Sequence, residues 1–142
     1  MKTKELTKED LALEGLLDTL RNLREPGELN HAEQESILER IASQDGHVFI
    51  AVDDGKIIGT TTLLIEQKYI RQGAMAGHIE DVATRKGYEG KGVASALLRR
   101  ALTYAEEKGC YKVILDCSRD TAPFYSRLGF YEAEVQMRYD FP

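Results

Sequence analysis

The sequence lacks an excess of positive charge. It has 19 Lys and Arg residues against 24 Asp and Glu, which gives a formal net charge of -5. General nucleic-acid binding relies on a basic face that displaces counterions from phosphates, so this balance argues against a nucleic-acid partner. An anionic ligand would have to be bound by a local group of basic residues.

The sequence also lacks a long apolar run. No stretch approaches the roughly 20 apolar residues that cross a bilayer. The first residues, MKTKELTKEDL, are too polar for a secretory signal peptide. We therefore expect a cytoplasmic protein with no membrane partner.

Cysteine is scarce, and its spacing excludes two uses. Cys110 and Cys117 lie seven residues apart in a segment of strand character, which separates them by roughly 23 Å and points them to opposite faces. They cannot pair in that geometry. No His or Cys stands near them at metal-ligand spacing, so we expect two buried free thiols and no metal site.

The composition of the chain predicts one globular domain over residues 1–142. Hydrophobic residues make up 42% and charged residues 30% of the chain, and no repeat or linker interrupts it. Leucines at helical spacing after Thr7 predict a helix over 8–23, which Pro26-Gly27 ends. A second helix is predicted over 32–43.

The pattern then changes to the two-residue period of strands. Residues 47–52 and 57–66 flank the turn at Asp53-Asp54-Gly55 and predict a β-hairpin. The later elements follow in chain order: a loop over 69–76, a strand over 77–84, a helix over 92–108 ended by Gly109, a strand over 111–117, a short helix over 121–128 and final strands within 130–139.

The most informative stretch lies between the strand over 77–84 and the helix over 92–108. Gly90 and Gly92 allow a tight turn that exposes backbone N–H groups, and the helix adds the positive end of its dipole. Such a corner binds phosphate. The glycine spacing fits neither the Walker loop nor the dinucleotide motif. A bare nucleoside triphosphate and NAD are therefore not expected.

The window Glu89-Gly90-Lys91-Gly92-Val93-Ala94 resembles the acyl-CoA pyrophosphate loop of the GCN5-related N-acetyltransferases (GNAT). The predicted order β-α-α-β-β-β-α-β-α-β-β is also the order of that fold, an α/β (α+β) single domain with a mixed, mostly antiparallel sheet flanked by helices. The chain departs from the family at Glu89, where a neutral or cationic side chain is usual. A carboxylate there repels a pyrophosphate unless it turns outward.

Within this family the chain resembles the glucosamine-6-phosphate N-acetyltransferases from about Thr19 to Val135. The blocks that carry the resemblance are Gly77-His78-Ile79-Glu80-Asp81-Val82, Gly109 to Cys117, and Phe124-Tyr125 with Leu128-Gly129-Phe130. The resemblance implies acetyl transfer from acetyl-CoA to the 2-amino group of D-glucosamine 6-phosphate by direct attack of the amine. It implies no metal.

The resemblance also implies roles for individual residues. Tyr125 is expected to protonate or hydrogen-bond the departing CoA thiolate, and Asp116 to orient the amine. The residues expected to bind acetyl-CoA are Val82, Ala83, Thr84, Gly90, Lys91, Gly92, Val93, Ala94, Ser95, Thr121 and Phe124. The residues expected to bind the amino sugar phosphate are Arg24, Lys68, Arg71, Glu80, Asp81, Tyr111, Lys112 and Arg138.

Two departures concern the phosphate. Arg24 stands where the family often has a small hydroxyl residue, and Asp140 stands where it has a basic residue, with Arg138 two positions earlier. Either Arg138 and Arg24 replace the usual contact, or the substrate is not phosphorylated at the usual position. Family members typically form homodimers with the sugar site near the interface, and the alternating apolar residues Val135 to Phe141 are consistent with pairing to a partner chain or with folding back.

Two other functions fit the same residues less well. An N-acetyltransferase for another small amine, such as free glucosamine, a polyamine or an amino acid, would keep Tyr125 and the glycine loop but would not depend on Lys68, Arg71 or Lys112. A non-catalytic acyl-CoA-binding module would have no need of Tyr125. Measuring CoA binding by titration would distinguish either of these two functions from a purely structural domain.

Overall fold

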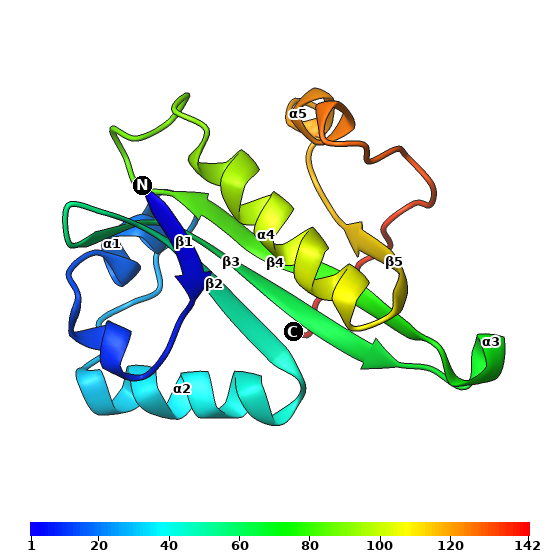
Figure 1. Ribbon diagram of the computed structural model, residues 1–142, viewed down its shortest axis with the longest axis horizontal. Helices are drawn as coiled ribbons and strands as arrows, with labels where there is room; N and C mark the ends of the chain where they lie inside the picture. The colour runs from blue at the N-terminus through cyan, green and yellow to red at the C-terminus, as the bar shows by residue number, and fades with distance from the viewer.

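Five strands form one mixed sheet in the order β1-β2-β3-β4-β5 (Figure 1). The structure is a computed structural model that describes all residues from 1 to 142. The strands are β1 (Lys2–Glu5), β2 (Gly46–Asp53), β3 (Lys56–Gln67), β4 (Met75–Thr84) and β5 (Cys110–Leu115). Neighbours are antiparallel except β4 and β5, which are parallel. The predicted mixed, mostly antiparallel sheet is confirmed.

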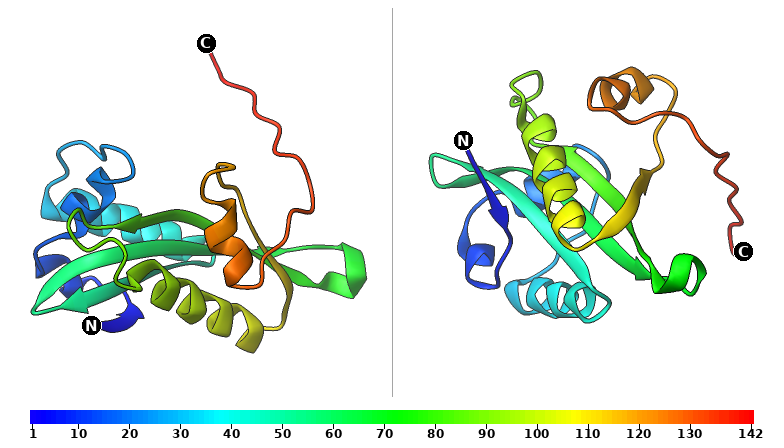
Figure 2. Two further views of the ribbon diagram at one scale, coloured as in Figure 1. Left: turned by 90° about the horizontal axis from the view of Figure 1, so that it is seen from above. Right: turned by 45° about the vertical axis from the view of Figure 1, so that its right-hand side comes forward.

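Helices cover both faces of this sheet, as the edge-on view in Figure 2 shows. α4 (Val93–Glu107) packs on one face, where Phe49, Leu63 and Leu97 are fully buried. α1 (Leu16–Arg21) and α2 (His31–Ser43) cover part of the other face, over a smaller cluster around Ile50 and Ile57. None of the helices has the length and apolar character that crossing a membrane requires.

The single helix predicted over residues 8–23 is wrong. A short 3-10 helix, η1 (Glu9–Ala12), and α1 replace it, because the chain between them is tied to the sheet. The Ile57 N–H donates to the Glu14 carbonyl at 2.9 Å, and Gly15 takes a φ of 120° that a leucine-rich helix does not allow. The Thr19 hydroxyl donates to the Ile57 carbonyl at 3.1 Å and fixes α1 on the same strand.

Most other predicted elements are confirmed within a few residues. The helix predicted over 32–43 is α2, which begins after Asn30 with a complete capping box to Glu33. The β2–β3 hairpin turns at Asp54 and Gly55, both with positive φ, as a two-residue hairpin turn requires. The helix predicted over 92–108 is α4, and Gly109 follows it with a φ of 87°.

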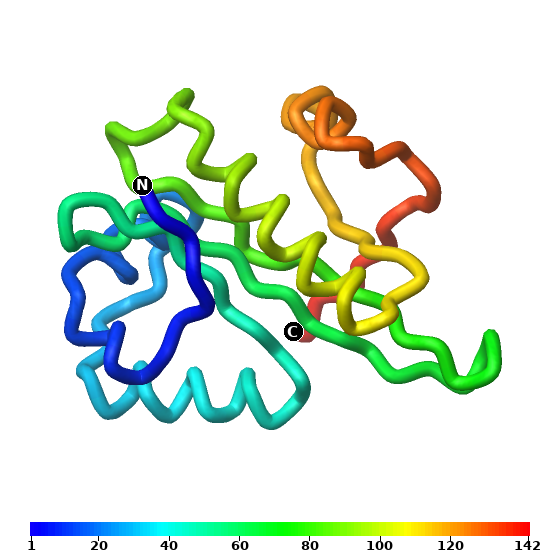
Figure 3. The backbone as a smooth tube through the Cα atoms, viewed as in Figure 1, coloured from blue at the N-terminus to red at the C-terminus, as the bar shows by residue number.

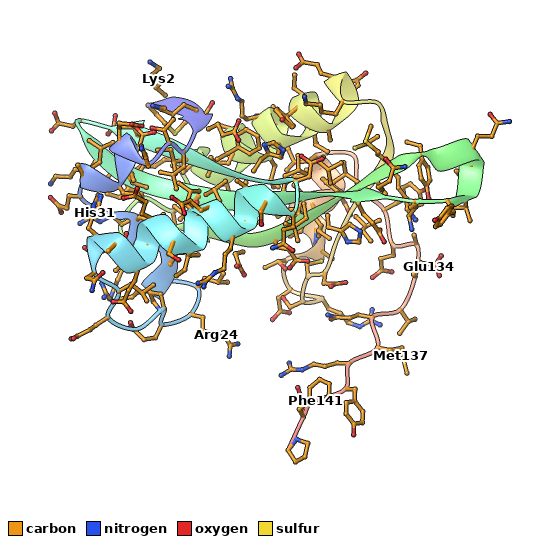
Figure 4. The ribbon with its side chains drawn as sticks, turned by 90° about the horizontal axis from the view of Figure 1, so that it is seen from below. Lys2, Arg24, His31, Glu134, Met137 and Phe141 are labelled. Atoms are coloured by element: carbon orange, nitrogen blue, oxygen red, sulfur yellow. The ribbon has the colours of Figure 1, made fainter.

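The final strands predicted within residues 130–139 are absent. After α5 (Ala122–Arg127), the last backbone hydrogen bond runs from the Phe130 N–H to the Tyr125 carbonyl. The tail beyond it leaves the body of the protein (Figure 2), and its side chains, Met137 and Phe141 among them, project into solvent (Figure 4). Val135 and Phe141 are 82% and 88% exposed. An alternating strand pattern forms no strand when the chain offers it no pairing partner.

Candidate active site

The candidate site lies where β4 and β5 stop pairing. The parallel ladder ends at the pair Ile79 and Leu115, whereas β4 continues to Thr84 in pairing with β3. Beyond Leu115 the chain turns away from β4 toward α5 (Figure 1). One edge of β4 from Glu80 onward therefore has backbone N–H and C=O groups with no strand partner. These groups can bind an extended, amide-containing ligand as an added strand does.

A β-bulge interrupts β4 at this point. Thr62 pairs with Glu80 and Thr60 with Ala83, so that Asp81 and Val82 together face Thr61. Asp81 takes a positive φ of 51°. In a regular strand the side chains of Glu80 and Asp81 would point to opposite faces, and the bulge makes the strand irregular here. Bulges of this kind change the direction of a side chain, and they are common beside active sites.

The predicted acceptor carboxylates lie close enough to influence one another. Loss of hydration raises the pKa of Glu80 above its usual value, and the negative charges of Asp81 and Asp116 raise it further. His78, on the same strand, acts in the opposite direction. Asp81 also lines an apolar cavity of about 170 Å³ between the sheet and the helices α1 and α2. This end of β4 is therefore suited to a cationic or hydroxyl-bearing ligand.

Asp116 has a partner that the sequence did not indicate. The Gln136 side-chain amide, from the C-terminal tail, donates to Oδ2 of Asp116 at 3.0 Å. Gln136 was not among the predicted site residues, because its neighbours show only the alternation of a strand. No local motif identifies such a contact, since the two residues are 20 positions apart.

Tyr125 lies on α5, after the segment that follows Asp116. Its ring packs edge to face against Phe124 at 5.0 Å and Phe130 at 6.0 Å between centroids. Burial raises the pKa of the phenol above its ordinary value, and the nearby Cys117 thiol adds to the effect. Tyr125 therefore stays protonated at neutral pH and can donate a hydrogen bond or a proton.

The glycine loop has the geometry expected of an anion site. Gly90 and Gly92 have φ values of 73° and 80°, and Gly92 precedes the first residue of α4. Where the loop passes into α4, the first backbone N–H that donates to a carbonyl of the chain is that of Ala96, and its acceptor is the Gly92 carbonyl. The preceding amides are left for a ligand. A Cβ at either glycine would meet no other atom, so their backbone angles rather than crowding require glycine.

The Glu89 carboxylate has a local backbone partner. It accepts a hydrogen bond from the Gly87 N–H, which precedes the glycine loop in sequence. The expected repulsion between Glu89 and a pyrophosphate is thereby reduced, because a local backbone donor holds the charge. Of the other residues predicted to bind acetyl-CoA, Val82, Ala83 and Thr84 lie on the free edge of β4. Thr121 and Phe124 lie at the start of α5.

The basic residues predicted to bind the amino sugar phosphate differ in their interaction partners. Lys68 lies 3.4 Å from the Glu66 carboxylate, which also accepts from His78 at 2.9 Å. Arg138 is paired with Asp140 at 2.8 Å. Arg24 is exposed on the loop between α1 and α2 and points into solvent (Figure 4).

Arg71 and Lys112 are held by an aromatic ring instead. The Arg71 guanidinium lies 4.5 Å and the Lys112 ammonium 5.4 Å from the centroid of Tyr111. Neither cation is in an ion pair with a carboxylate, so both keep their hydrogen-bond donors for a ligand.

The His, Cys, Asp and Glu side chains form neither a metal-binding cluster nor a disulfide bond. No group of three or more His, Cys, Asp or Glu side chains is placed to hold a metal ion. Both cysteines are free, as expected, but only Cys110 is partly buried. Cys117 is exposed, because it lies past the end of β5 rather than inside a strand.

Comparison with known proteins identifies relatives of this arrangement. The family model described as acetyltransferase (GNAT) family matches residues 16–130. Glucosamine 6-phosphate N-acetyltransferase of Trypanosoma brucei brucei is 40% identical over 134 residues, which cover 93% of this chain and 91% of the relative.

Two crystal structures share the fold over nearly the whole chain. An acetyltransferase of Trypanosoma brucei has a TM-score of 0.92 and 35% identity, with 99% of each chain covered. Glucosamine-6-phosphate N-acetyltransferase of Arabidopsis thaliana has a TM-score of 0.92 and 31% identity, with 99% of this chain and 98% of the other covered.

Proposed function

Since the chain belongs to the acetyltransferase (GNAT) family, we propose that it transfers the acetyl group of acetyl-CoA to the 2-amino group of D-glucosamine 6-phosphate. The products are N-acetyl-D-glucosamine 6-phosphate and CoA. The observation that carries this proposal is the end of the β4–β5 ladder, where a free strand edge, a glycine loop and a group of carboxylates meet.

The donor is bound along the free edge of β4 and on the glycine loop. The pantetheine arm of acetyl-CoA contains two amides, and these pair with the backbone of Val82 to Thr84 as a short added strand. The pyrophosphate lies on the amides of residues 90–95, at the N-terminus of α4. A backbone N–H near Val82 polarises the thioester carbonyl.

The acceptor amine approaches from the side of the carboxylates. Asp116 accepts a hydrogen bond from the amine through Oδ1, because Oδ2 already accepts from Gln136. Glu80 and Asp81 accept from the sugar hydroxyls. The negative charge of this group attracts the amine as an ammonium ion, and the proton must then leave before attack.

The chemical step is direct aminolysis of the thioester. The neutral amine attacks the carbonyl carbon, a C–N bond forms and the C–S bond breaks. The thiolate takes a proton from Tyr125, whose raised pKa keeps that proton on the phenol at neutral pH. The proton released by the amine passes to Asp116 or to water and restores the phenol through solvent.

The phosphate of the acceptor is bound by Arg71 and Lys112. They are the predicted cations that share one ring and carry no carboxylate partner, whereas Lys68 and Arg138 are already paired. A guanidinium fixed over an aromatic ring presents its donors in a fork that matches phosphate oxygens.

We propose that the chain forms a homodimer, and two features support this. Tyr111 lies near the start of β5 and Asp116 directly after its end, five residues or about 16 Å apart at strand rise, so the basic and acidic groups are at opposite ends of one strand. A second copy brings the basic end of one β5 to the acidic end of the other. The tail, with Val135 and Met137 more than four-fifths exposed, pairs with the partner in place of its own sheet. The tail's contact with Asp116 supports a site near that interface.

We propose the cytoplasm as the compartment. The two free cysteines support it, since reducing conditions keep thiols unpaired there. Subcellular fractionation with antibody detection tests this assignment.

The experiment that tests the function follows the release of CoA thiol. Acetyl-CoA is combined separately with glucosamine 6-phosphate, glucosamine, glucosamine 1-phosphate and spermidine. Turnover with the 6-phosphate alone is expected. Turnover with another amine only would keep the reaction and change the substrate. CoA binding by calorimetry without any turnover would identify an acyl-CoA-binding module instead.

A further inference from the structure

The tip of the β3–β4 hairpin has an unusual backbone. Three successive residues, Arg71, Gln72 and Gly73, have φ values of 53°, 59° and 76°. Two of them carry side chains, for which the left-handed region costs of order 1–3 kcal/mol each. Such a conformation persists only where the surroundings enforce it. The tip projects beyond the other strands (Figure 3), so the core cannot do so.

Two backbone hydrogen bonds run across the turn, from the Gly73 N–H to the Tyr69 carbonyl at 3.1 Å and from the Ala74 N–H to the Ile70 carbonyl at 3.2 Å. The side chain of Gln67, the last residue of β3, adds the contacts that close its neck. Its Nε2 donates to the carbonyls of Gly73 at 2.8 Å and Lys68 at 3.0 Å, with Ala74 at 3.5 Å. All three partners are acceptors, so the amide orientation is determined by the contacts themselves. The backbone pair from the Lys68 N–H to the Ala74 carbonyl, 2.9 Å, lies beside them. Gln67 therefore closes the neck of the turn.

The turn in its left-handed form is what brings Arg71 over Tyr111. Its neighbours Tyr69 and Ile70 are 101% and 60% exposed, so their side chains do not anchor the tip. The only contact that the tip makes with β5 through an aromatic ring is the one between Arg71 and Tyr111, at 4.5 Å. Without closure at the neck, residues 71 and 72 would return to negative φ and the guanidinium would lose its fixed place.

We propose that Gln67 is a positioning residue for the acceptor phosphate, which acts by holding the turn that presents Arg71 beside Lys112. This assignment rests on the proposed function, and it adds a residue that touches neither substrate. Gln67 donates only to backbone carbonyls, so its effect is confined to the phosphate end of the acceptor. The donor loop and Tyr125 lie on other elements, and the rate of acetyl transfer does not depend on it.

The test compares the wild type with Gln67→Met, which keeps the length of the side chain and removes its donors. KM and kcat are measured for glucosamine 6-phosphate and for glucosamine at saturating acetyl-CoA. The expected result is a KM for the 6-phosphate raised about tenfold, the equivalent of a lost charge-assisted hydrogen bond, with kcat and the KM for glucosamine unchanged. Gln44→Met, at an exposed glutamine on the end of α2, is the matched control and leaves all values unchanged.

Two further variants separate positioning from folding. Gln67→Glu also removes the donors, and it is expected to raise the same KM. Adding Gln72→Gly to Gln67→Met makes the left-handed turn easier, so it is expected to recover part of the lost affinity. The KM for acetyl-CoA reports the integrity of the remainder of the site and stays constant.

Three results overturn the assignment. They are an unchanged KM for the 6-phosphate in both Gln67 variants, an equal rise for both sugars, and a loss of kcat alone. Each of these leaves the proposed function standing if the wild type prefers the 6-phosphate. A wild type without that preference overturns the proposed substrate, and the role of Gln67 with it.

Discussion

Tyr125→Phe removes one oxygen from the site and little else. The ring stacks edge to face against Phe124 and Phe130, and phenylalanine keeps both contacts. We therefore expect no measurable change in the midpoint of thermal unfolding and no change in the KM for acetyl-CoA. The loss appears in kcat, because the phenol acts only as the C–S bond breaks.

The size of the loss follows from the leaving group. General acid catalysis contributes about 10²–10⁴ in rate, and a thiolate needs less help than an amine or alkoxide, so the lower value applies. A fall in kcat of about 100-fold, or ~2.7 kcal/mol of transition-state stabilisation, is expected. Burial raises the pKa of Tyr125 above its ordinary value, so the wild-type enzyme keeps this proton donor through neutral and mildly alkaline pH.

The assay is thiol release under saturating acetyl-CoA and glucosamine 6-phosphate, measured from pH 6 to pH 9. Tyr131→Phe is the control, since Tyr131 is 84% exposed on the tail. A loss of less than about threefold for Tyr125→Phe would refute the reasoning, because no general acid of this kind contributes so little. Equal losses in both variants would also refute it.

Three other changes test separate parts of the site. Glu80→Gln should raise the free energy of unfolding at pH 7 by about 0.5 kcal/mol, the scale of exposed charge pairs, and should raise the KM of the acceptor. Because the pKa of Glu80 is raised in the folded protein, wild-type stability falls as pH rises through its titration, and calorimetry across pH 4 to 7 should show that slope reduced in the variant. Glu89→Gln should change the KM for acetyl-CoA by less than about threefold, since the carboxylate already accepts a hydrogen bond from the Gly87 N–H, and a tenfold gain in affinity would show that the charge does oppose the donor. Removal of residues 131–142 should convert a dimer to a monomer in light scattering, whereas a truncated chain that remains dimeric would exclude the tail from the interface.

Local sequence patterns predicted the elements that are determined by residues close together in the sequence. Leucine and alanine at helical spacing in α4 identify a buried helical face, and Gly109 marks its end. Gly90 and Gly92 predicted the anion-binding corner, because the required backbone angles depend on residue type at those positions alone. The same holds for the capping box of α2.

Contacts between segments that are distant in the sequence determine the parts of the fold that local patterns did not predict. The helix over 8–23 is broken because Glu14 pairs with Lys56 on β3, an interaction that no helical periodicity reveals. The bulge at Asp81 depends on the register of β3. The tail has a strand pattern from Val135 to Phe141 and no strand in this chain to pair with.

The candidate site shows the same division. Glu80, Asp116 and Tyr125 were predicted from short motifs, and the structure brings Glu80 and Asp116 together and places Tyr125 beside Cys117. The partner of Arg71 was not predictable, because Arg71 meets Tyr111 only through the turn geometry and the pairing of β4 with β5. Gln67 and Gln136 carry no motif at all.

Substrate preference is measured as kcat/KM of the wild-type chain for glucosamine 6-phosphate and for glucosamine, with acetyl-CoA as donor. We expect a ratio of at least about 100 in favour of the 6-phosphate, since the Arg71 and Lys112 donors have no carboxylate partner. We also expect the acetyl group on the 2-amino nitrogen of the product. Equal values for the two sugars, or acetylation at another position, would contradict the proposed function.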